Sequence, residues 1–122
     1  MQTICCIEDE PQMRELVQLV LGAECKLLPA ASAREAIEHL VHEPALFLID
    51  LHLPGMNGLE LTKLIRTIFP SVPIVIITAL SRDKYEDKAL AMGATAFIEK
   101  PFNPQRLRNV VGQLLPKRSL AN

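Results

Sequence analysis

The chain has 122 residues, of which 49% are hydrophobic and 22% charged, and its net charge is -1 at pH 7. This length fits one domain with a real core, and the composition excludes a disordered chain. The near-neutral charge and the 4% of aromatic residues argue against direct nucleic-acid binding, and no apolar run reaches the roughly 18 residues of a membrane span. The first residues lack the basic region of a secretory signal, so we expect a cytoplasmic protein in which Cys5, Cys6 and Cys25 are buried, reduced thiols.

Short β-rich runs alternate with segments of helical period five times along the chain. Strands are expected at residues 3–7, 26–28, 45–49, 72–77 and 95–98, and helices at 11–21, 32–42, 59–69, 82–92 and 104–115. Five βα units in this length predict a doubly wound α/β domain, in which a five-stranded parallel sheet lies between two layers of helices. We place this domain at residues 1–116 and expect residues 117–122 to be a tail or the start of a linker.

The second predicted helix carries a specific packing expectation. Ser32 is a suitable N-cap because Glu35 follows three residues later. The helical period directs four apolar side chains inward, namely Ala36, Ile37, Leu40 and Val41. It leaves His39 and His42 on the polar side, where we expect solvated side chains.

Polar residues follow three of the apolar runs at the point where each run ends. Glu8 and Asp9 follow the first run, Asp50 the third and Lys100 the fifth. The carboxyl ends of parallel strands meet at one edge, where the functional crevice of such a sheet lies. Three carboxylates in one place repel each other unless a cation lies among them, and oxygen ligands suit Mg²⁺. Taken alone, Glu8 and Asp9 equally fit an N-terminal helix cap.

Lys100 and the residues after the fourth run extend this site. Pro101 follows the lysine, so a cis peptide bond would fix where the ammonium points. Thr78 and Ala79 offer a hydroxyl and a backbone N–H at the same edge. Together with a carboxylate and Mg²⁺, these groups suit the oxygens of a phosphoryl group.

Four sequence segments resemble the receiver domain of two-component response regulators, and the resemblance spans about residues 3–115. The segments are Ile7-Glu8-Asp9-Glu10, Leu48-Ile49-Asp50-Leu51-His52-Leu53-Pro54-Gly55-Met56-Asn57-Gly58, Ile77-Thr78-Ala79 and Phe97-Ile98-Glu99-Lys100-Pro101-Phe102. The resemblance implies the strand order 2-1-3-4-5 and a signalling module that is not a turnover enzyme.

The same resemblance assigns roles to individual residues. Asp50 would be the phosphoacceptor, and Lys100 would pair with it and then with the phosphoryl oxygens. Mg²⁺, or Mn²⁺, would be held by Asp9, Asp50 and the backbone carbonyl of His52, with Glu8 acting partly through water. Thr78 and the amide of Ala79 would bind the phosphoryl group. Phe97 would be the switch aromatic that turns inward when Thr78 moves.

The resemblance also implies partners. A histidine kinase or histidine phosphotransfer protein would supply the phosphoryl group. An effector domain or a second copy would use the face formed by the fourth helix, fifth strand and fifth helix, which includes Arg82, Lys84, Tyr85 and Lys88. If an effector domain follows, transcription control is a frequent arrangement in the family.

Three positions depart from the common family pattern. Glu8 stands where aspartate is common, which adds a methylene that a water-mediated position absorbs. His52 is an unusual side chain two residues after Asp50, and either overhangs the site and alters how water reaches the acyl phosphate or is a solvated loop residue. Phe97 replaces a frequent tyrosine, so it switches by burial without a hydroxyl.

Other functions remain as alternatives. The main one is a receiver-like interaction module that signals without phosphorylation. A Mg²⁺-dependent aspartyl phosphatase of the haloacid-dehalogenase type would need an aspartate at position 52, where this chain has histidine. A flavodoxin-like binder is disfavoured because Glu8, Asp9 and Glu10 would repel a flavin phosphate.

Overall fold

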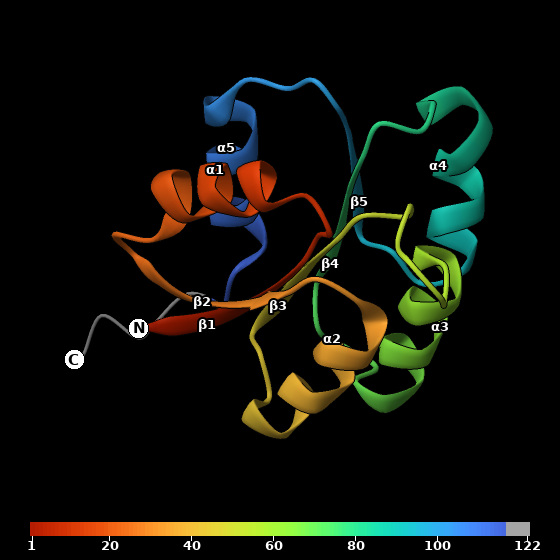
Figure 1. The fold of residues 1–122 in the computed structure, drawn as a ribbon, viewed down its shortest axis with the longest axis horizontal. Coiled ribbons are helices and arrows are strands. Elements are labelled where there is room, and N and C mark those ends of the chain that lie inside the picture. Colours follow the sequence, from red (N-terminus) through yellow and green to blue (C-terminus); the bar gives the residue numbers. More distant parts are fainter. Residues whose placement is uncertain (117–122) are drawn as a thin grey trace.

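The computed structural model describes residues 1–116, which form a parallel sheet with the strand order β2-β1-β3-β4-β5 (Figure 1). The strands are β1 (Gln2–Ile7), β2 (Cys25–Ala30), β3 (Leu46–Ile49), β4 (Ile74–Thr78) and β5 (Ala96–Glu99). The predicted fold class and strand order are therefore confirmed. Residues 117–122, where a tail or linker was predicted, lie outside the described residues.

The strands form where the sequence has runs of apolar residues. Every residue of β3 and β4 is buried, as expected for central parallel strands that are covered on both faces. β2 is longer than predicted because it stays in register with β1 from Gln2 opposite Cys25 to Ile7 opposite Ala30. It includes Pro29, which an edge strand tolerates because its outer side has no ladder to complete.

Five helices cover the sheet in two layers (Figure 1). They are α1 (Pro11–Leu21), α2 (Ala33–His39), α3 (Gly58–Ile68), α4 (Arg82–Ala91) and α5 (Pro104–Leu114). α1 and α5 lie on one face, and α2, α3 and α4 lie on the other. No helix within residues 1–116 is long and apolar enough to cross a bilayer.

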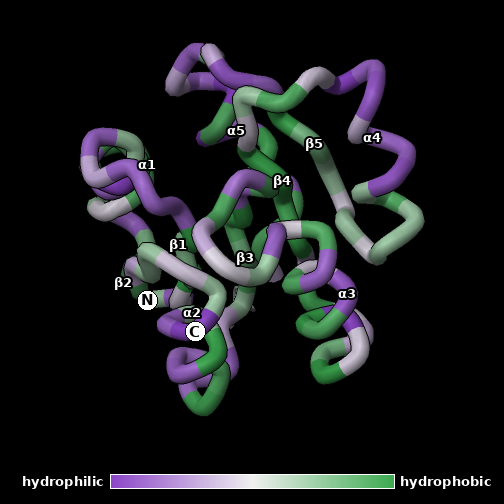
Figure 2. Tube along the Cα trace, turned by 45° about the vertical axis from the view of Figure 1, so that its right-hand side comes forward, coloured by the Kyte–Doolittle hydropathy of each residue, from purple (hydrophilic) through white to green (hydrophobic). Residues whose placement is uncertain are grey.

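Each layer has its own core. On one face, the core contains Val17 and Leu21 of α1 together with Leu107 and Val111 of α5. On the opposite face, it contains Leu61 and Ile65, which anchor α3. α4 is held differently, because Ala89 is its only buried residue. Figure 2 shows this helix as mostly hydrophilic along its length. Its apolar anchoring is therefore limited to Ala89 and the partly buried Tyr85.

The expectation for the second helix was wrong at two positions. Ile37 is 41% exposed and Val41 is 78% exposed, whereas Ala33 and Ala36 are buried. The α-helix ends at His39, and a 3₁₀ turn follows over Leu40–His42. This turn has fewer residues per turn than an α-helix, so Val41 points outward.

His39 also differs from its expected solvated state. Its ring is partly buried, and Nε2 lies 2.9 Å from the carbonyl oxygen of Pro29 in β2. The ring therefore ties α2 to the edge strand, whereas His42 is exposed as predicted.

Candidate functional site

The predicted strand-end residues meet at the carboxyl edge of the sheet. Three backbone hydrogen bonds extend the ladders by one residue beyond the apolar runs: Glu8 N donates to Ala30 O, Asp50 N to Ile7 O, and Lys100 N to Thr78 O, at 2.7–3.0 Å. These bonds fix the direction in which each loop leaves its strand. The resulting pocket of about 300 Å³ is lined by Asp9, Glu10, Asp50, His52, Thr78, Ala79 and Leu80.

Lys100 is the centre of this arrangement. Its Nζ lies 2.6 Å from Glu8 Oε1, 2.9 Å from Asp50 Oδ2 and 3.3 Å from Glu10 Oε1. Burial acts to lower the pKa of the ammonium, but the hydrogen bonds and charges of Glu8 and Asp50 outweigh it and raise the pKa. Lys100 is therefore charged throughout the physiological range. The peptide bond between Lys100 and Pro101 is cis.

Glu8 is almost completely buried and both of its oxygens are engaged. Oε1 accepts from Lys100, and Oε2 accepts from the backbone N–H of Glu10 at 3.1 Å. Burial, aided by the charge of Asp50, raises the pKa of Glu8 above its ordinary value even though Lys100 opposes that shift. A carboxylate held in this way fits the expected indirect role toward a metal better than direct ligation.

Asp50 has a defined orientation. Oδ2 accepts from Lys100, and Oδ1 accepts from the backbone N–H of His52 at 3.0 Å. The side chain is only 5% exposed, yet it lines the open pocket. A carboxylate fixed by two donors while facing a pocket is arranged as a nucleophile or a ligand.

The donor set fits a hard divalent cation. One oxygen each of Glu8, Asp9 and Asp50 lies within 4.8 Å of the others, and Asp9 is exposed. Mg²⁺ takes one or two protein carboxylates and keeps several waters, so Asp9 and Asp50 suffice as direct ligands. The three carboxylates predicted for the metal are therefore brought together, whereas the role of the His52 carbonyl stays a prediction.

Thr78 and Ala79 lie opposite this cluster. Thr78 is fully buried and its Oγ1 accepts from the backbone N–H of Leu80 at 3.3 Å, while Ala79 is exposed on the pocket wall. Because the Thr78 oxygen is the acceptor in this bond, the hydroxyl hydrogen is free to donate to another group.

Phe97, the predicted switch aromatic, is buried in this structure. Its ring is only 2% exposed and already belongs to the core between the sheet and α4. Phe97 pairs with Ile76 across the two strands, and Glu99 pairs with Thr78, so all four side chains lie on one face of the sheet. The ring therefore lies inward in this structure, and its coupling to a movement of Thr78 stays a prediction. The imidazole of His52 is exposed at the pocket rim, as the sequence allowed.

Two contributors were missed at the sequence level. Glu10 supplies a third carboxylate to Lys100, and Arg14 donates to the backbone oxygen of Glu8 at 2.6 Å. Glu10 had a usable signal, since it directly follows the acidic pair. Arg14 had none, because a basic residue on an exposed helix face is ordinarily solvated.

Comparisons with known proteins agree with this geometry. The family model described as "Response regulator receiver domain" matches residues 4–112. The response regulator protein PilR of Pseudomonas aeruginosa is 36% identical over 120 residues, covering 97% of this chain and 27% of PilR. The phosphate regulon transcriptional regulatory protein PhoB of the same organism is 33% identical over 112 residues, covering 87% of this chain and 48% of PhoB.

A solved structure extends these comparisons. The BeF3-activated N-terminal receiver domain of RstA from Klebsiella pneumoniae is 30% identical, with a TM-score of 0.88, covering 95% of this chain and 100% of that one. This chain spans about a quarter to a half of the length of the two curated relatives.

Proposed function

Because this chain belongs to the response regulator receiver domain family of two-component signalling, we propose that Asp50 is its phosphoacceptor. The observation that carries the proposal is the contact of 2.9 Å between Lys100 Nζ and Asp50 Oδ2 at an open pocket. A carboxylate oxygen of Asp50 attacks the phosphorus of a phosphohistidine, the P–N bond breaks, and the imidazole leaves and takes up a proton. The product is an acyl phosphate on Asp50.

The neighbouring residues lower the barrier by charge and position. Lys100 donates to oxygens on which negative charge builds up. Asp9, Asp50 and the backbone carbonyl of His52 would hold Mg²⁺ or Mn²⁺, with Glu8 acting through water. When bound, the metal neutralises charge on the transferring oxygens. Thr78 and the amide of Ala79 take the remaining phosphoryl oxygens.

Output follows from the charge that phosphorylation adds, about -1.5 to -2 by analogy with hydroxyl phosphates. When the Thr78 hydroxyl moves toward this group, the loop between Thr78 and α4 moves with it. α4 can follow because it has little apolar anchoring. We propose that the segment from Thr78 to Phe97 shifts between two states, with the burial of Phe97 biasing one of them. The module carries one phosphoryl group per signalling event, so it is not a turnover enzyme.

The partner that supplies the phosphoryl group is a histidine kinase or a histidine phosphotransfer protein. The surface of α4, β5 and α5 contacts an effector domain or a second copy. PhoB is a transcriptional regulatory protein and this chain matches 48% of it, which supports transcription control as one output.

Acyl phosphate labelling tests the proposal. The protein is incubated with Mg²⁺ and acetyl phosphate, and its intact mass is measured together with those of Asp50→Asn and the control Asp83→Asn, which alters an exposed carboxylate of α4. We expect one added phosphoryl group in the wild type and in Asp83→Asn, and none in Asp50→Asn.

Absence of labelling, also with a phosphorylated kinase as donor, would favour the phosphorylation-independent interaction module. Labelling that survives Asp50→Asn would refute Asp50 as the acceptor. Sustained release of phosphate over many cycles would favour the aspartyl phosphatase.

A further inference from the structure

The ammonium group of Lys100 has no free donor. A lysine carries three N–H donors, and Nζ contacts three carboxylates, those of Glu8, Glu10 and Asp50. While a phosphoryl group is being transferred and Asp50 is still a carboxylate, Lys100 must also donate to a phosphoryl oxygen. One of its three partners must then be released.

The three partners differ in how firmly they are held. The contacts with Glu8 and Asp50 are 2.6 and 2.9 Å long, and both of these side chains are about 95% buried. The contact with Glu10 is 3.3 Å long, and the Glu10 side chain is 62% exposed. Water reaches the Glu10 carboxylate and can replace this contact more readily than the two contacts with buried carboxylates. Glu10 is therefore the partner that Lys100 loses most easily.

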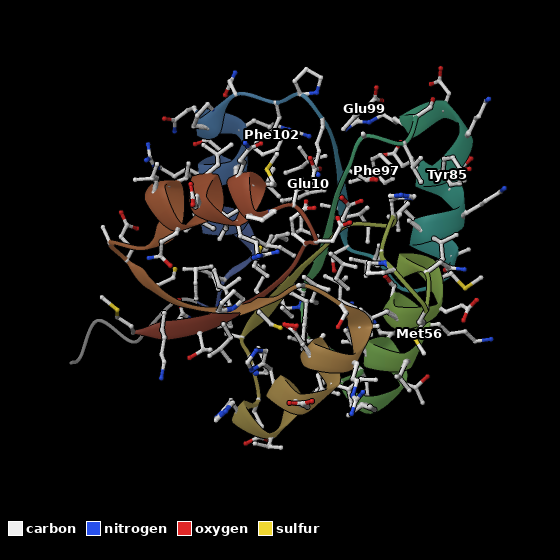
Figure 3. All side chains as sticks on the ribbon, viewed as in Figure 1. Glu10, Met56, Tyr85, Phe97, Glu99 and Phe102 are labelled. Atoms are coloured by element: carbon white, nitrogen blue, oxygen red, sulfur yellow. The ribbon has the colours of Figure 1, made fainter. Side chains whose placement is uncertain are left out.

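The position of Glu10 suits this exchange. It is the residue before Pro11 at the start of α1, and its own backbone N–H donates to Glu8 Oε2. Figure 3 shows its side chain at the start of α1, on the edge of the sheet that bears the site. The residue also lines the pocket in which a phosphoryl group would lie. Its backbone is thus fixed at the site while its carboxylate reaches Lys100 from the solvent side.

We propose that Glu10 is a positioning residue that holds the third N–H of Lys100 in the unphosphorylated protein and yields it to a phosphoryl oxygen. This inference rests on the proposed function of Asp50. Glu10 competes with the incoming group for Lys100, so it lowers the rate at which small donors phosphorylate Asp50. Loss of the contact then accelerates phosphorylation by about two- to fivefold, the range of a weak ion pair whose carboxylate is open to water.

Two substitutions distinguish the effect of the Lys100–Glu10 contact from the effect of the negative charge of Glu10. Glu10→Gln removes the charge and the ion pair, whereas Glu10→Asp keeps the charge but is one methylene too short to keep the contact at its present backbone position. Glu15→Gln is the matched control, because Glu15 is an exposed carboxylate on the same helix. Rates of phosphorylation by acetyl phosphate at saturating Mg²⁺ are compared by intact mass for all four proteins.

We expect Glu10→Gln and Glu10→Asp to react about two- to fivefold faster than the wild type, and Glu15→Gln to match it. If Glu10→Asp behaves like the wild type while Glu10→Gln is faster, general repulsion of the donor explains the effect and the proposal is wrong. Rates that are unchanged or slower in both variants overturn it as well.

A second measurement does not depend on phosphorylation. In protein labelled with ¹⁵N-lysine, the Nζ resonance of Lys100, assigned from its loss in Lys100→Met, is followed in each Glu10 variant. A shift in both variants, but not in Glu15→Gln, shows the contact. An unmoved resonance refutes it. If the wild type takes no phosphoryl group while the resonance shifts, the contact exists but the function proposed for Asp50 and the exchange built on it are both wrong.

Discussion

Lys100 and Asp50 lie 50 positions apart in the chain, yet Nζ of the lysine contacts Oδ2 of the aspartate at 2.9 Å and both side chains are at least 90% buried. Asp50 follows β3 and Lys100 follows β5, so the contact crosses over the end of β4. Glu8, from β1, completes the buried cluster on the other side. One ammonium group therefore contacts both buried carboxylates at this edge of the sheet.

Replacement of Lys100 by methionine leaves Glu8 and Asp50 buried without their counter-charge. Removal of one partner from a buried ion pair costs about 3–5 kcal/mol. We expect Lys100→Met to lose about 3 kcal/mol of unfolding free energy in EDTA, and Mg²⁺ to restore part of it, since a cation again lies among the carboxylates. Urea unfolding with and without Mg²⁺ measures both effects. Lys84→Met, at an exposed position on α4, is the control, and equal stability of the two variants in EDTA would contradict the prediction.

We expect Thr78 to be required for the response to phosphorylation but not for phosphorylation itself. Thr78→Ala removes the hydroxyl near the site but leaves Asp50 and Lys100 in place, so we expect Asp50 still to accept a phosphoryl group. The chain has one tyrosine, Tyr85 on α4, which 3-fluorotyrosine labels at a single position. The ¹⁹F signal should shift in the wild type and in Thr78→Ser when Mg²⁺ and beryllium fluoride are added, and should not shift in Thr78→Ala. An equal shift in all three would show that the hydroxyl carries no signal.

The His52 side chain is exposed at the pocket rim, while its backbone N–H holds Asp50 Oδ1. If the imidazole shields the acyl phosphate from water, the smaller side chain in His52→Asn shortens the lifetime of the phosphoryl group severalfold. The half-life is read from intact mass after removal of the donor. His42→Asn, at another exposed histidine, should keep the wild-type half-life. Equal half-lives for His52→Asn and the wild type would make His52 a solvated loop residue only.

α4 begins at a cap supplied by another element. Ser81 makes no side-chain cap bond, and Glu99 Oε1 of β5 instead accepts from the backbone N–H of Arg82 at 2.9 Å. Figure 3 shows Glu99 beside the start of this helix. Because a lost N-cap costs about 1 kcal/mol, we expect Glu99→Ala to lower the unfolding free energy by that amount. Glu86→Ala removes only an exposed pair with Arg82 at 3.8 Å and should stay within about 0.5 kcal/mol of the wild type. Equal losses would mean that Glu99 does not cap the helix.

The sequence predicted the elements and which strand-end residues meet, because both depend on local patterns. Apolar runs define the strands, and the residue after each run lies at the carboxyl edge whatever the packing of the helices. Asp50, Thr78 and Lys100 could therefore be placed together before their distances were known.

Contacts between side chains that are distant in sequence could not be predicted in the same way. Glu10 reaches Lys100 across 90 positions, and the cap of α4 comes from Glu99 in another element. Neither contact leaves a periodic signal. The exposure of Val41 was missed because a 3₁₀ turn replaces the last turn of α2, and helical period alone does not show where that change occurs.

The buried cysteines allow the packing of the two cores to be tested through the reactivity and pKa of their thiols. Burial, with a smaller effect from the neighbouring Cys6, raises the pKa of Cys5 to about 12, and burial followed by the charge of Glu8 does the same for Cys6. Because all three cysteines are buried and their thiols stay protonated at pH 8, we expect no reaction with Ellman's reagent in the folded protein and reaction of all three in urea.

The same shifts predict how stability depends on pH. The unfolded chain releases the thiol protons near pH 9 and the folded protein only near pH 12, so their contribution to stability is complete below pH 9 and is lost as the pH rises toward 12. Urea unfolding at pH 8 and pH 10.5 measures the loss. Cys5→Ala/Cys6→Ala, which lacks both thiols, should lose less stability over this interval than the wild type. An identical loss in the two proteins would assign the pH dependence to other groups, and fast reaction of the native thiols at pH 8 would contradict their burial.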